Sequence, residues 1–288
     1  MPVNPARADP HLPLAAIARL LACPECGAAM ALDDRSLSCA RRHAFDLARQ
    51  GYVSLLTGAS TKMTGDTADM LDARAAFQRA RYFGPIADAV TAAVTSTTPA
   101  RAILEIGAGT GYYLAETLDA APEAHGIAVD VSKPAARRCA RAHPRAASVL
   151  ADAWRGLPVR DDALTHVLSV FAPRNPEEVA RVLAPGGVFV IATPTPRHLS
   201  ELITPLGMVS VDAAKDDRLT AALSGHFTAI DRTPVEYTMT LDHTAITNVA
   251  AMGPSAHHAA TERTGRIATL PDEMQVTASV TVTTYRAR

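Results

Sequence analysis

The chain contains very little lysine, few aromatic residues and only four cysteines among its 288 residues. Lysine occurs only at positions 62, 133 and 215, so arginine supplies almost all of the basic charge. The formal net charge is −1, which excludes a strong overall basic field for attracting nucleic acid, although arginines can still gather on one face. Four cysteines, one of them far from the other three, do not fit the disulfide framework of a small secreted protein.

Long hydrophobic runs are also missing. The apolar stretch at 12–23, LPLAAIARLLAC, is interrupted by Arg19 and is too short to cross a bilayer. Apolar residues nevertheless make up 48% of the chain, which is enough for a substantial core. We therefore expect a globular, cytoplasmic protein with no membrane partner.

Three regions follow one another along the chain. The pattern of residues 1–57 predicts an N-terminal arm and a metal-binding module. Residues 58–99 are predicted to form a linker loop followed by helices that are broken near Gly84-Pro85. From 100 to 288 strand patterns alternate with helix patterns, which predicts an α/β domain with a mostly parallel sheet. The predicted strands of this domain are 100–107, 125–131, 148–153, 164–171 and 186–194, followed by a C-terminal pair at 227–241 and 275–287.

A glycine-rich loop follows the first predicted strand of the α/β domain. The segment LEIGAGTG places Glu105 at the tip of the strand and Gly107, Gly109 and Gly111 at alternate positions. Glycines allow a sharp turn and the close approach of a ligand, and the helix that follows offers free N–H donors. Asp130 ends the second predicted strand, where a carboxylate can accept both hydroxyls of a ribose. The pattern predicts a nucleotide-type cofactor, whereas its simplest alternative is a tight strand–helix turn.

Two cofactor classes fit such a loop. The dinucleotide fingerprint requires a third glycine at position 112, where this chain has a bulky tyrosine. The segment APGGVFVIATP at 184–194 adds a Pro-Gly-Gly turn before the fifth strand, which is typical of S-adenosylmethionine-dependent methyltransferases. The sequence thus favours a class I (Rossmann-like) methyltransferase domain over a dehydrogenase.

Three cysteines and a histidine lie within 21 positions near the N-terminus. Cys23-x-x-Cys26 is followed by twelve residues and then by Cys39-x-x-x-His43, the spacing of a tetrahedral zinc site. Four protein ligands leave no open position for water, so the predicted zinc ion is structural rather than catalytic. The alternative is that these cysteines are core residues or redox thiols.

Two groups of basic residues could contact phosphates. One surrounds the predicted metal module, and the other lies on the helix pattern at 133–145, whose alternative interpretation is a solvated helix face. Their members are Arg35, Arg41, Arg42 and Arg49 in the first group, and Lys133, Arg137, Arg138, Arg141 and Arg145 in the second.

Several motifs resemble those of one known family, the 23S ribosomal RNA guanine-N1 methyltransferases. They are HAFDLARQGYVSLL, DTADMLDARAAF, ILEIGAGTGYYL, DVSKPAARRCARAHPRA, VFAPRNPEEVARVLAPGG and IATPTPRHLSEL, which together span nearly the whole chain. The sequences of the segments SKPAARR, FAPRNP and AMGPS are most similar to those of the tylosin-type macrolide-resistance branch. An aromatic residue expected after AMGPS is replaced by His257 and His258, which leaves the identity of the target guanine open.

The resemblance implies a substrate, an assembly and a set of cofactor contacts. The substrate would be N1 of a guanine in a 23S rRNA hairpin loop at the peptide exit tunnel, and the enzyme a homodimer. Matching positions imply that Tyr82, Gly109, Thr110 and His198 contact S-adenosylmethionine. Two alternatives stay open: a small-molecule methyltransferase of the same fold, and a non-catalytic zinc-containing RNA-binding protein.

The general base cannot be assigned from the sequence. Guanine N1 carries a proton that has to be removed, and the candidates near the expected cofactor end of the sheet are Asp66, Asp152 and Asn175. Asp152 could instead contact the adenine, and Asn175 could simply cap a helix that begins at Pro176.

Overall fold

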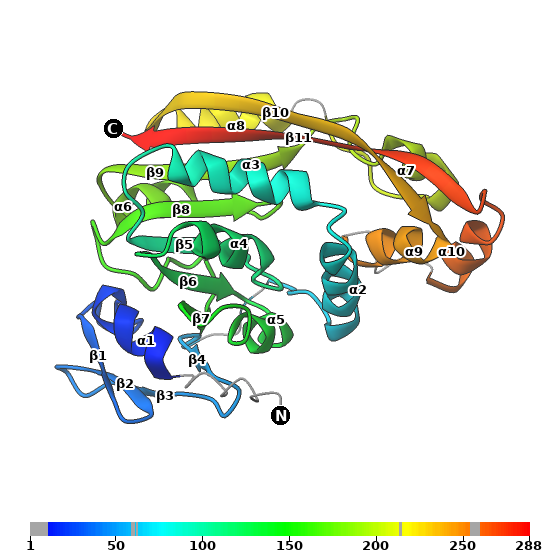
Figure 1. Ribbon diagram of the computed structural model, residues 1–288. Helices are drawn as coiled ribbons and strands as arrows, with labels where there is room; N and C mark the ends of the chain where they lie inside the picture. The colour runs from blue at the N-terminus through cyan, green and yellow to red at the C-terminus, as the bar shows by residue number, and fades with distance from the viewer. Residues whose placement is uncertain (1–10, 59–60, 62, 213–214, 254–259) are drawn as a thin grey trace, which may run out of the picture.

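An eight-stranded mixed sheet forms the centre of the molecule (Figure 1). The computed structural model describes residues 11–288 except 59–60, 62, 213–214 and 254–259, so the predicted arm at 1–10 and His257-His258 lie outside the described residues. The strand order is β10-β11-β9-β8-β5-β6-β7-β4. Their bounds are β4 Tyr52–Ser54, β5 Ala102–Ile106, β6 His125–Asp130, β7 Ala146–Leu150, β8 Leu164–Val170, β9 Leu183–Pro194, β10 Phe227–Asp242 and β11 Glu273–Ala287.

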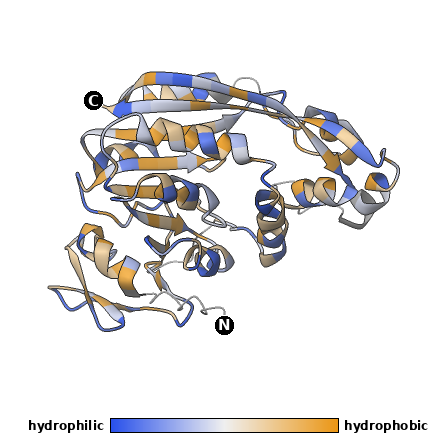
Figure 2. Cartoon of the chain, in the orientation of Figure 1, coloured by the Kyte–Doolittle hydropathy of each residue, from blue (hydrophilic) through white to orange (hydrophobic). Residues whose placement is uncertain are grey.

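The central strands run parallel and the C-terminal pair runs antiparallel. β5 pairs in parallel with both β6 and β8, which makes it the point where the strand order reverses. β10 and β11 form a long antiparallel hairpin whose second strand pairs with β9. The predicted α/β fold with an antiparallel C-terminal pair is therefore confirmed. Orange hydrophobic residues dominate the central strands in Figure 2, as expected for a parallel sheet covered on both faces.

Helices cover both faces of the sheet. Several begin where the sequence provides a cap: Thr67, Ser132 and Asn175 each accept a hydrogen bond from a backbone N–H three residues later. The predicted break near Gly84-Pro85 is present, because the proline stands in the first turn of a new helix. The helices are α1 His11–Ile17, α2 Ala68–Arg79, α3 Gly84–Thr95, α4 Tyr112–Ala120, α5 Lys133–Cys139, α6 Pro176–Val182, α7 Ser200–Leu206, α8 Lys215–Leu223, α9 His243–Ala251 and α10 Ala260–Ile267. Among the described residues, we find no helix with the length and apolarity that crossing a membrane requires.

A small three-stranded sheet precedes the main one. It contains β1 Met30–Asp33, β2 Ser36–Cys39 and β3 Ala44–Asp46, joined as antiparallel neighbours. Buried side chains of Leu14 and Ile17 on α1 belong to the same apolar cluster as Ile127 and Val149 of the main sheet. The short strand β4, which the sequence places in the 1–57 module, pairs with β7 of the main sheet. The small sheet is thereby fixed firmly against the large one.

The far end of the β10–β11 hairpin extends past the carboxyl ends of the central strands. It carries α9 and α10, and α9 packs against α2 (Figure 1). Together α2 and α9 cover the end of the sheet at which β5 and β6 finish. This arrangement encloses the space in which the candidate site lies.

Candidate active site and metal centre

The glycine-rich loop turns the chain sharply from β5 into α4. Gly107, Gly109 and Gly111 have φ angles of +64°, +57° and +77°, in the left-handed region that favours glycine. A Cβ atom at Gly111 would stand 2.6 Å from Cβ of Ala142, so this position also excludes a side chain by space. The loop predicted from the sequence is therefore present and requires glycine for two separate reasons.

Asp130 holds the glycine loop in place from the end of β6. Its Oδ2 accepts a hydrogen bond from the backbone N–H of Gly109 at 2.8 Å, and its Oδ1 accepts one from Ser132 at 2.8 Å. Burial raises the pKa of this carboxyl, whereas the two N–H donors act in the opposite direction. Each carboxylate oxygen keeps a second lone pair, so Asp130 can still accept two ribose hydroxyls.

A cavity of about 830 Å³ opens at the carboxyl ends of β5, β6, β7 and β8. This volume lies in the range of small-molecule and cofactor sites, roughly 300–1,000 Å³, and its position is the usual ligand site of an open α/β sheet. Of the residues predicted from the sequence, the wall contains Asp66, Glu105, Gly107, Asp130, Asp152, Asn175 and His198. The cavity thus brings together side chains that are up to 132 positions apart (Asp66 to His198) in the chain.

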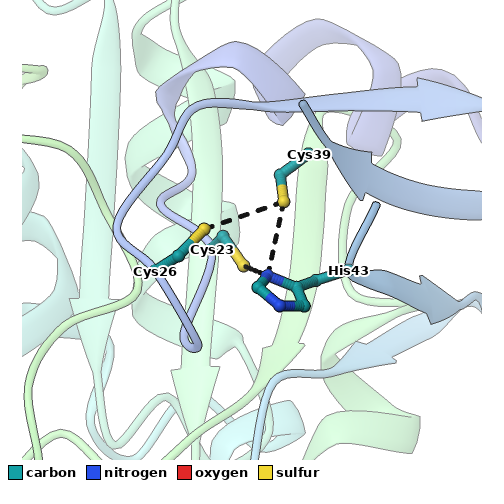
Figure 3. A group of neighbouring side chains, drawn as sticks. All are labelled: Cys23, Cys26, Cys39 and His43. Atoms are coloured by element: carbon teal, nitrogen blue, oxygen red, sulfur yellow. Dashed lines mark hydrogen bonds between the residues drawn. The ribbon is translucent and has the colours of Figure 1, made fainter. Parts of the chain in front are cut away.

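The four predicted metal ligands converge in the N-terminal module (Figure 3). Sγ of Cys23 lies 3.4 Å from Nδ1 of His43, Sγ of Cys39 lies 3.6 Å from the same nitrogen, and the sulfurs of Cys26 and Cys39 are 3.8 Å apart. A tetrahedral zinc ion with Zn–S bonds of about 2.3 Å and Zn–N bonds of about 2.0 Å separates its ligand atoms by about 3.5–3.8 Å. The residues present therefore fit zinc in both chemistry and spacing.

Comparisons with known proteins agree with this architecture. The zinc ribbon family described as "RlmA, N-terminal" matches residues 21–60, and the "Methyltransferase domain" family matches residues 103–187. The 23S rRNA (guanine(748)-N(1))-methyltransferase of Streptomyces fradiae is 44% identical over 274 residues, which is 94% of this chain and 98% of that protein. The chain belongs to the 23S rRNA guanine-N1 methyltransferase family. S-adenosylmethionine is accordingly the cofactor of this methyltransferase, and its zinc ion is structural.

One further relative and one solved structure extend the comparison. A Micromonospora griseorubida protein assigned to the same guanine-N1 methyltransferases is 41% identical, and the match covers 92% of this chain and 97% of that protein. Among solved structures, a chain of the complex between the Haloferax volcanii Trm112 methyltransferase activator and a methyltransferase superposes with a TM-score of 0.50 at 18% identity. That match covers 78% of this chain and 99% of the other, and it supports the fold alone.

Three of the four cofactor contacts implied by the resemblance do not lie on the cavity wall of the methyltransferase. The ring of Tyr82 packs on Phe77 at 4.7 Å, whereas the next residue, Phe83, lines the cavity. The hydroxyl of Thr110 donates to Oε1 of Gln78 at 2.6 Å, behind the glycine loop. Gly109 is also absent from the wall, although its N–H fixes Asp130 as described above.

Glu105 is buried beneath the glycine loop and is 1% exposed. Its Oε2 accepts a hydrogen bond from the backbone N–H of Leu114 at 3.1 Å. Burial, helped by the nearby Asp130 and opposed by the Leu114 N–H and by Arg74, raises the pKa of this carboxyl from 4.5 to about 8. Glu105 therefore carries a proton at neutral pH in the protein alone.

Arg74, which was not among the residues predicted from the sequence, lies on α2 above the glycine loop. Its Nη1 pairs with Oδ2 of Asp66 at 2.6 Å, and its Nη2 donates to the carbonyl of Met252 at 2.7 Å. A Cβ atom at Gly109 would approach Nη1 to 2.7 Å, so the glycine also makes room for the guanidinium. Arg74 could have been identified from its position in the DTADMLDARAAF motif, where a basic residue stands between apolar residues of a predicted helix.

The three candidate bases differ in what they already bind. Asp66 forms the ion pair with Arg74, and Asp152 accepts from the hydroxyl of Thr61 at 2.6 Å and from the N–H of Trp154 at 3.0 Å. Oδ1 of Asn175 accepts from the N–H of Glu178 and caps α6, which is the alternative weighed from the sequence. All three line the cavity, but only the two carboxylates have an atom that can take a proton.

His198 is held as a neutral imidazole with a defined tautomer. Its Nδ1 accepts a hydrogen bond from the backbone N–H of Ser279 at 3.2 Å, which leaves the ring proton on Nε2. Burial lowers the pKa of this histidine to about 4. At neutral pH His198 is thus a hydrogen-bond donor toward the cavity and not a base.

The two basic groups have different surroundings. Arg35, Arg41, Arg42 and Arg49 are exposed around the zinc centre. In the second group Arg138 pairs with Asp72, and Arg145 donates to four carbonyls at the end of α4 and just beyond it, so both stabilise the fold. Only Lys133, Arg137 and Arg141 of that group are exposed.

We expect the stability of the protein to fall as the pH rises from about 4.5 to 8 through Glu105. The folded state keeps the Glu105 proton up to a pKa of about 8, whereas the unfolded chain loses it near 4.5, so rising pH favours unfolding within this window. Glu105→Gln retains the acceptor for Leu114 and should remove this component, a difference of about 2–4 kcal/mol between pH 5 and pH 8. Urea unfolding at the two pH values measures it.

The matched control for this prediction is Glu123→Gln, at a carboxylate that is 79% exposed on its side chain. This variant should follow the wild-type pH dependence. An unchanged pH dependence in Glu105→Gln would contradict the assignment of the effect to Glu105.

Proposed function

We propose that this methyltransferase transfers the methyl group of S-adenosylmethionine to N1 of a guanine in a hairpin loop of 23S rRNA at the peptide exit tunnel, and that the modification confers macrolide resistance. The observation that carries the proposal is the 44% identity, over nearly the whole chain, to the guanine(748)-N1 methyltransferase of Streptomyces fradiae. The combination of a cofactor cavity with a zinc ribbon in one chain supports it. We extend the proposal to a cytoplasmic homodimer, because the family that the sequence resembles has this assembly and acts on ribosomal RNA.

The cofactor, when bound, supplies an electrophilic methyl group on a sulfonium. Asp130 would accept the ribose hydroxyls from the end of β6, where its carboxylate is already oriented by Gly109 and Ser132. Glu105 lies beneath the glycine loop and is the acidic group available for the amino end of the cofactor. The walls of the cavity are largely apolar side chains, which exclude water. Such a site would favour methyl transfer mainly by holding the cofactor and the guanine in the right relative position.

Proton removal from guanine N1 needs a basic atom in the cavity. His198 is excluded because its Nδ1 lone pair already accepts from Ser279. Asn175 is excluded because an amide has no basic atom at neutral pH. Asp66 and Asp152 remain; Asp66 lies just before α2, Asp152 lies just after β7, and both line the cavity. We propose that one of these two carboxylates accepts the proton.

The zinc module supplies a second wall for the RNA in this proposal. Its exposed arginines surround a rigid metal centre, and hairpin loops are recognised by shape and by splayed bases. Apolar packing of α1 on β6 and β7 prevents the module from moving independently of the cofactor cavity. The RNA contacts and the transferred methyl group are thereby kept in a fixed relation.

The test is methylation of unmodified 23S rRNA followed by reverse transcription. A methyl group on N1 blocks the Watson–Crick edge, so the transcriptase should stop next to the modified guanine only when S-adenosylmethionine was present. A stop in the exit-tunnel hairpin supports the proposal and identifies the guanine. Protein that binds the cofactor but gives no stop would overturn it in favour of a small-molecule substrate.

We expect Asn175→Ala to lower stability without abolishing methyl transfer. The variant loses the side-chain cap of α6, which costs about 1 kcal/mol of unfolding free energy. Urea unfolding and turnover with RNA measure the two effects. Asp242→Ala, which removes the corresponding cap of α9, shows what the loss of a cap does by itself. A loss of turnover above about 100-fold with normal stability would restore Asn175 as a catalytic residue.

A further inference from the structure

Phe171 has an unusual backbone conformation directly after β8. Its φ angle is +55°, in the left-handed region that is unfavourable for a bulky side chain. The turn itself is held by main-chain groups: the N–H of Phe171 donates to the carbonyl of Ala192 at 3.1 Å, and Ser169 Oγ donates to the carbonyl of Ala172. Glycine or asparagine would make this turn at lower cost. The turn therefore does not explain why a phenylalanine stands here.

Burial in the core does not explain it either. Phe171 is 39% exposed, although the central strands beside it consist of buried residues. Three rings hold it: His198 is stacked at 5.6 Å and 26°, Phe83 lies at 5.9 Å, and Tyr113 meets it edge-on at 6.4 Å. These rings come from three separate parts of the chain and fix the orientation of Phe171. Phe171 also lines the cavity.

The order of the strands decides which ligand meets Phe171. Asp130 on β6 marks the ribose position, and the cofactor would extend from there across the glycine loop at the end of β5. β8 is the neighbour of β5 on the side opposite to β6. Phe171 therefore lies beyond the glycine loop, on the part of the wall that the adenosine does not need. This is where the methyl acceptor has to enter.

We propose that Phe171 stacks on the target guanine and holds the plane of the base so that its N1 edge faces the methyl group. This inference rests on the proposed function and adds to it a residue that contacts the substrate. A base splayed out of an RNA loop loses its stacking neighbours, and an aromatic ring replaces them without using the Watson–Crick edge. The left-handed turn places the ring over the cavity instead of in the core, which accounts for the strained conformation.

The experiment compares kcat/KM for in vitro transcribed 23S rRNA with the affinity for S-adenosylmethionine measured by calorimetry. Phe171→Ala should lower kcat/KM for RNA by about 10- to 100-fold, as expected for the loss of one stacked base, and leave the cofactor Kd within about twofold. Phe171→Tyr should stay near the wild type because it keeps the ring. Phe171→Leu should resemble the alanine variant because it is apolar but has no flat face.

Two controls separate stacking from packing. Phe171→Gly relieves the left-handed conformation and should keep Tm close to that of the wild type while losing RNA activity. Ile230→Ala removes a side chain that is 41% exposed on β10 and should leave kcat/KM unchanged.

The remaining outcomes overturn the inference in distinguishable ways. Full activity of Phe171→Ala or of Phe171→Leu excludes stacking while the proposed function stands. A parallel loss of cofactor affinity in Phe171→Ala assigns the ring to the cofactor. Wild-type protein that methylates no 23S rRNA overturns the proposed function and this inference with it.

Discussion

Replacing Cys39 with alanine should abolish zinc binding and reduce methylation of 23S rRNA by about 100-fold or more, because small zinc modules fold only with their metal. The variant loses one of four ligand atoms that lie within 4.8 Å of one another. The cofactor cavity is built from α2, α9 and the ends of β5–β8, which contribute no metal ligand, so S-adenosylmethionine should still bind with a Kd within about threefold of the wild type. Tm should fall, since α1 and its neighbours pack on the main sheet.

The measurements are zinc per chain by mass spectrometry, Tm, cofactor affinity by calorimetry and turnover with RNA. Cys139→Ala is the matched control, because Cys139 is a fully buried thiol on α5 that packs in the core and is remote from the zinc ligands in the chain. This control should keep one zinc ion per chain at a modest cost in stability. Stoichiometric zinc in Cys39→Ala would disprove the ligand set, and unchanged RNA turnover without zinc would remove the module from the RNA site.

Asp130→Ala should weaken the binding of S-adenosylmethionine by roughly 30- to 1,000-fold, the equivalent of about 2–4 kcal/mol. The substitution removes the acceptor for the ribose hydroxyls and also frees the N–H groups of Gly109 and Ser132, which hold the glycine loop against β6. Calorimetry with the purified protein measures the change in Kd. Asp130→Asn should weaken cofactor binding nearly as much, because the side-chain NH₂ group is a donor and cannot accept a hydrogen bond from the backbone N–H that it would face.

Asp119→Ala provides the comparison for Asp130. This carboxylate lies on the surface with 77% of its side chain exposed and contacts His143, so its loss should leave the cofactor Kd unchanged. If Asp130→Ala bound the cofactor as tightly as this control, the ribose position inferred for the cavity would be wrong. Phe171 would then lose its assignment to the acceptor side of the cavity as well.

The zinc ligands and the glycine loop could be predicted from the sequence because both depend on short-range geometry. Cys23 and Cys26 flank a tight turn, and the Cys39–His43 pair lies at the end of one hairpin, so spacing alone indicates the site. Gly107 to Gly111 directly follow β5, and Asp130 ends the adjacent parallel strand β6, so the two groups meet where the carboxyl ends of these strands lie side by side. Strand and helix order followed from hydrophobic patterns, although β9 begins earlier, at Leu183, than the predicted 186.

The rest of the site was decided by the tertiary structure. Tyr82 and Phe83 are neighbours in sequence, yet one packs on Phe77 while the other faces the cavity, because adjacent side chains at a helix start point in different directions. Arg74 and Phe171 meet the cavity only because the β10–β11 hairpin brings α9 against α2 and because β8 lies next to β5. The sequence by itself determined the chemistry of the zinc centre and of the cofactor loop, whose groups are local in the chain. Which side chains line the acceptor wall was decided by contacts between segments that lie far apart in the chain, and no local pattern encodes these contacts.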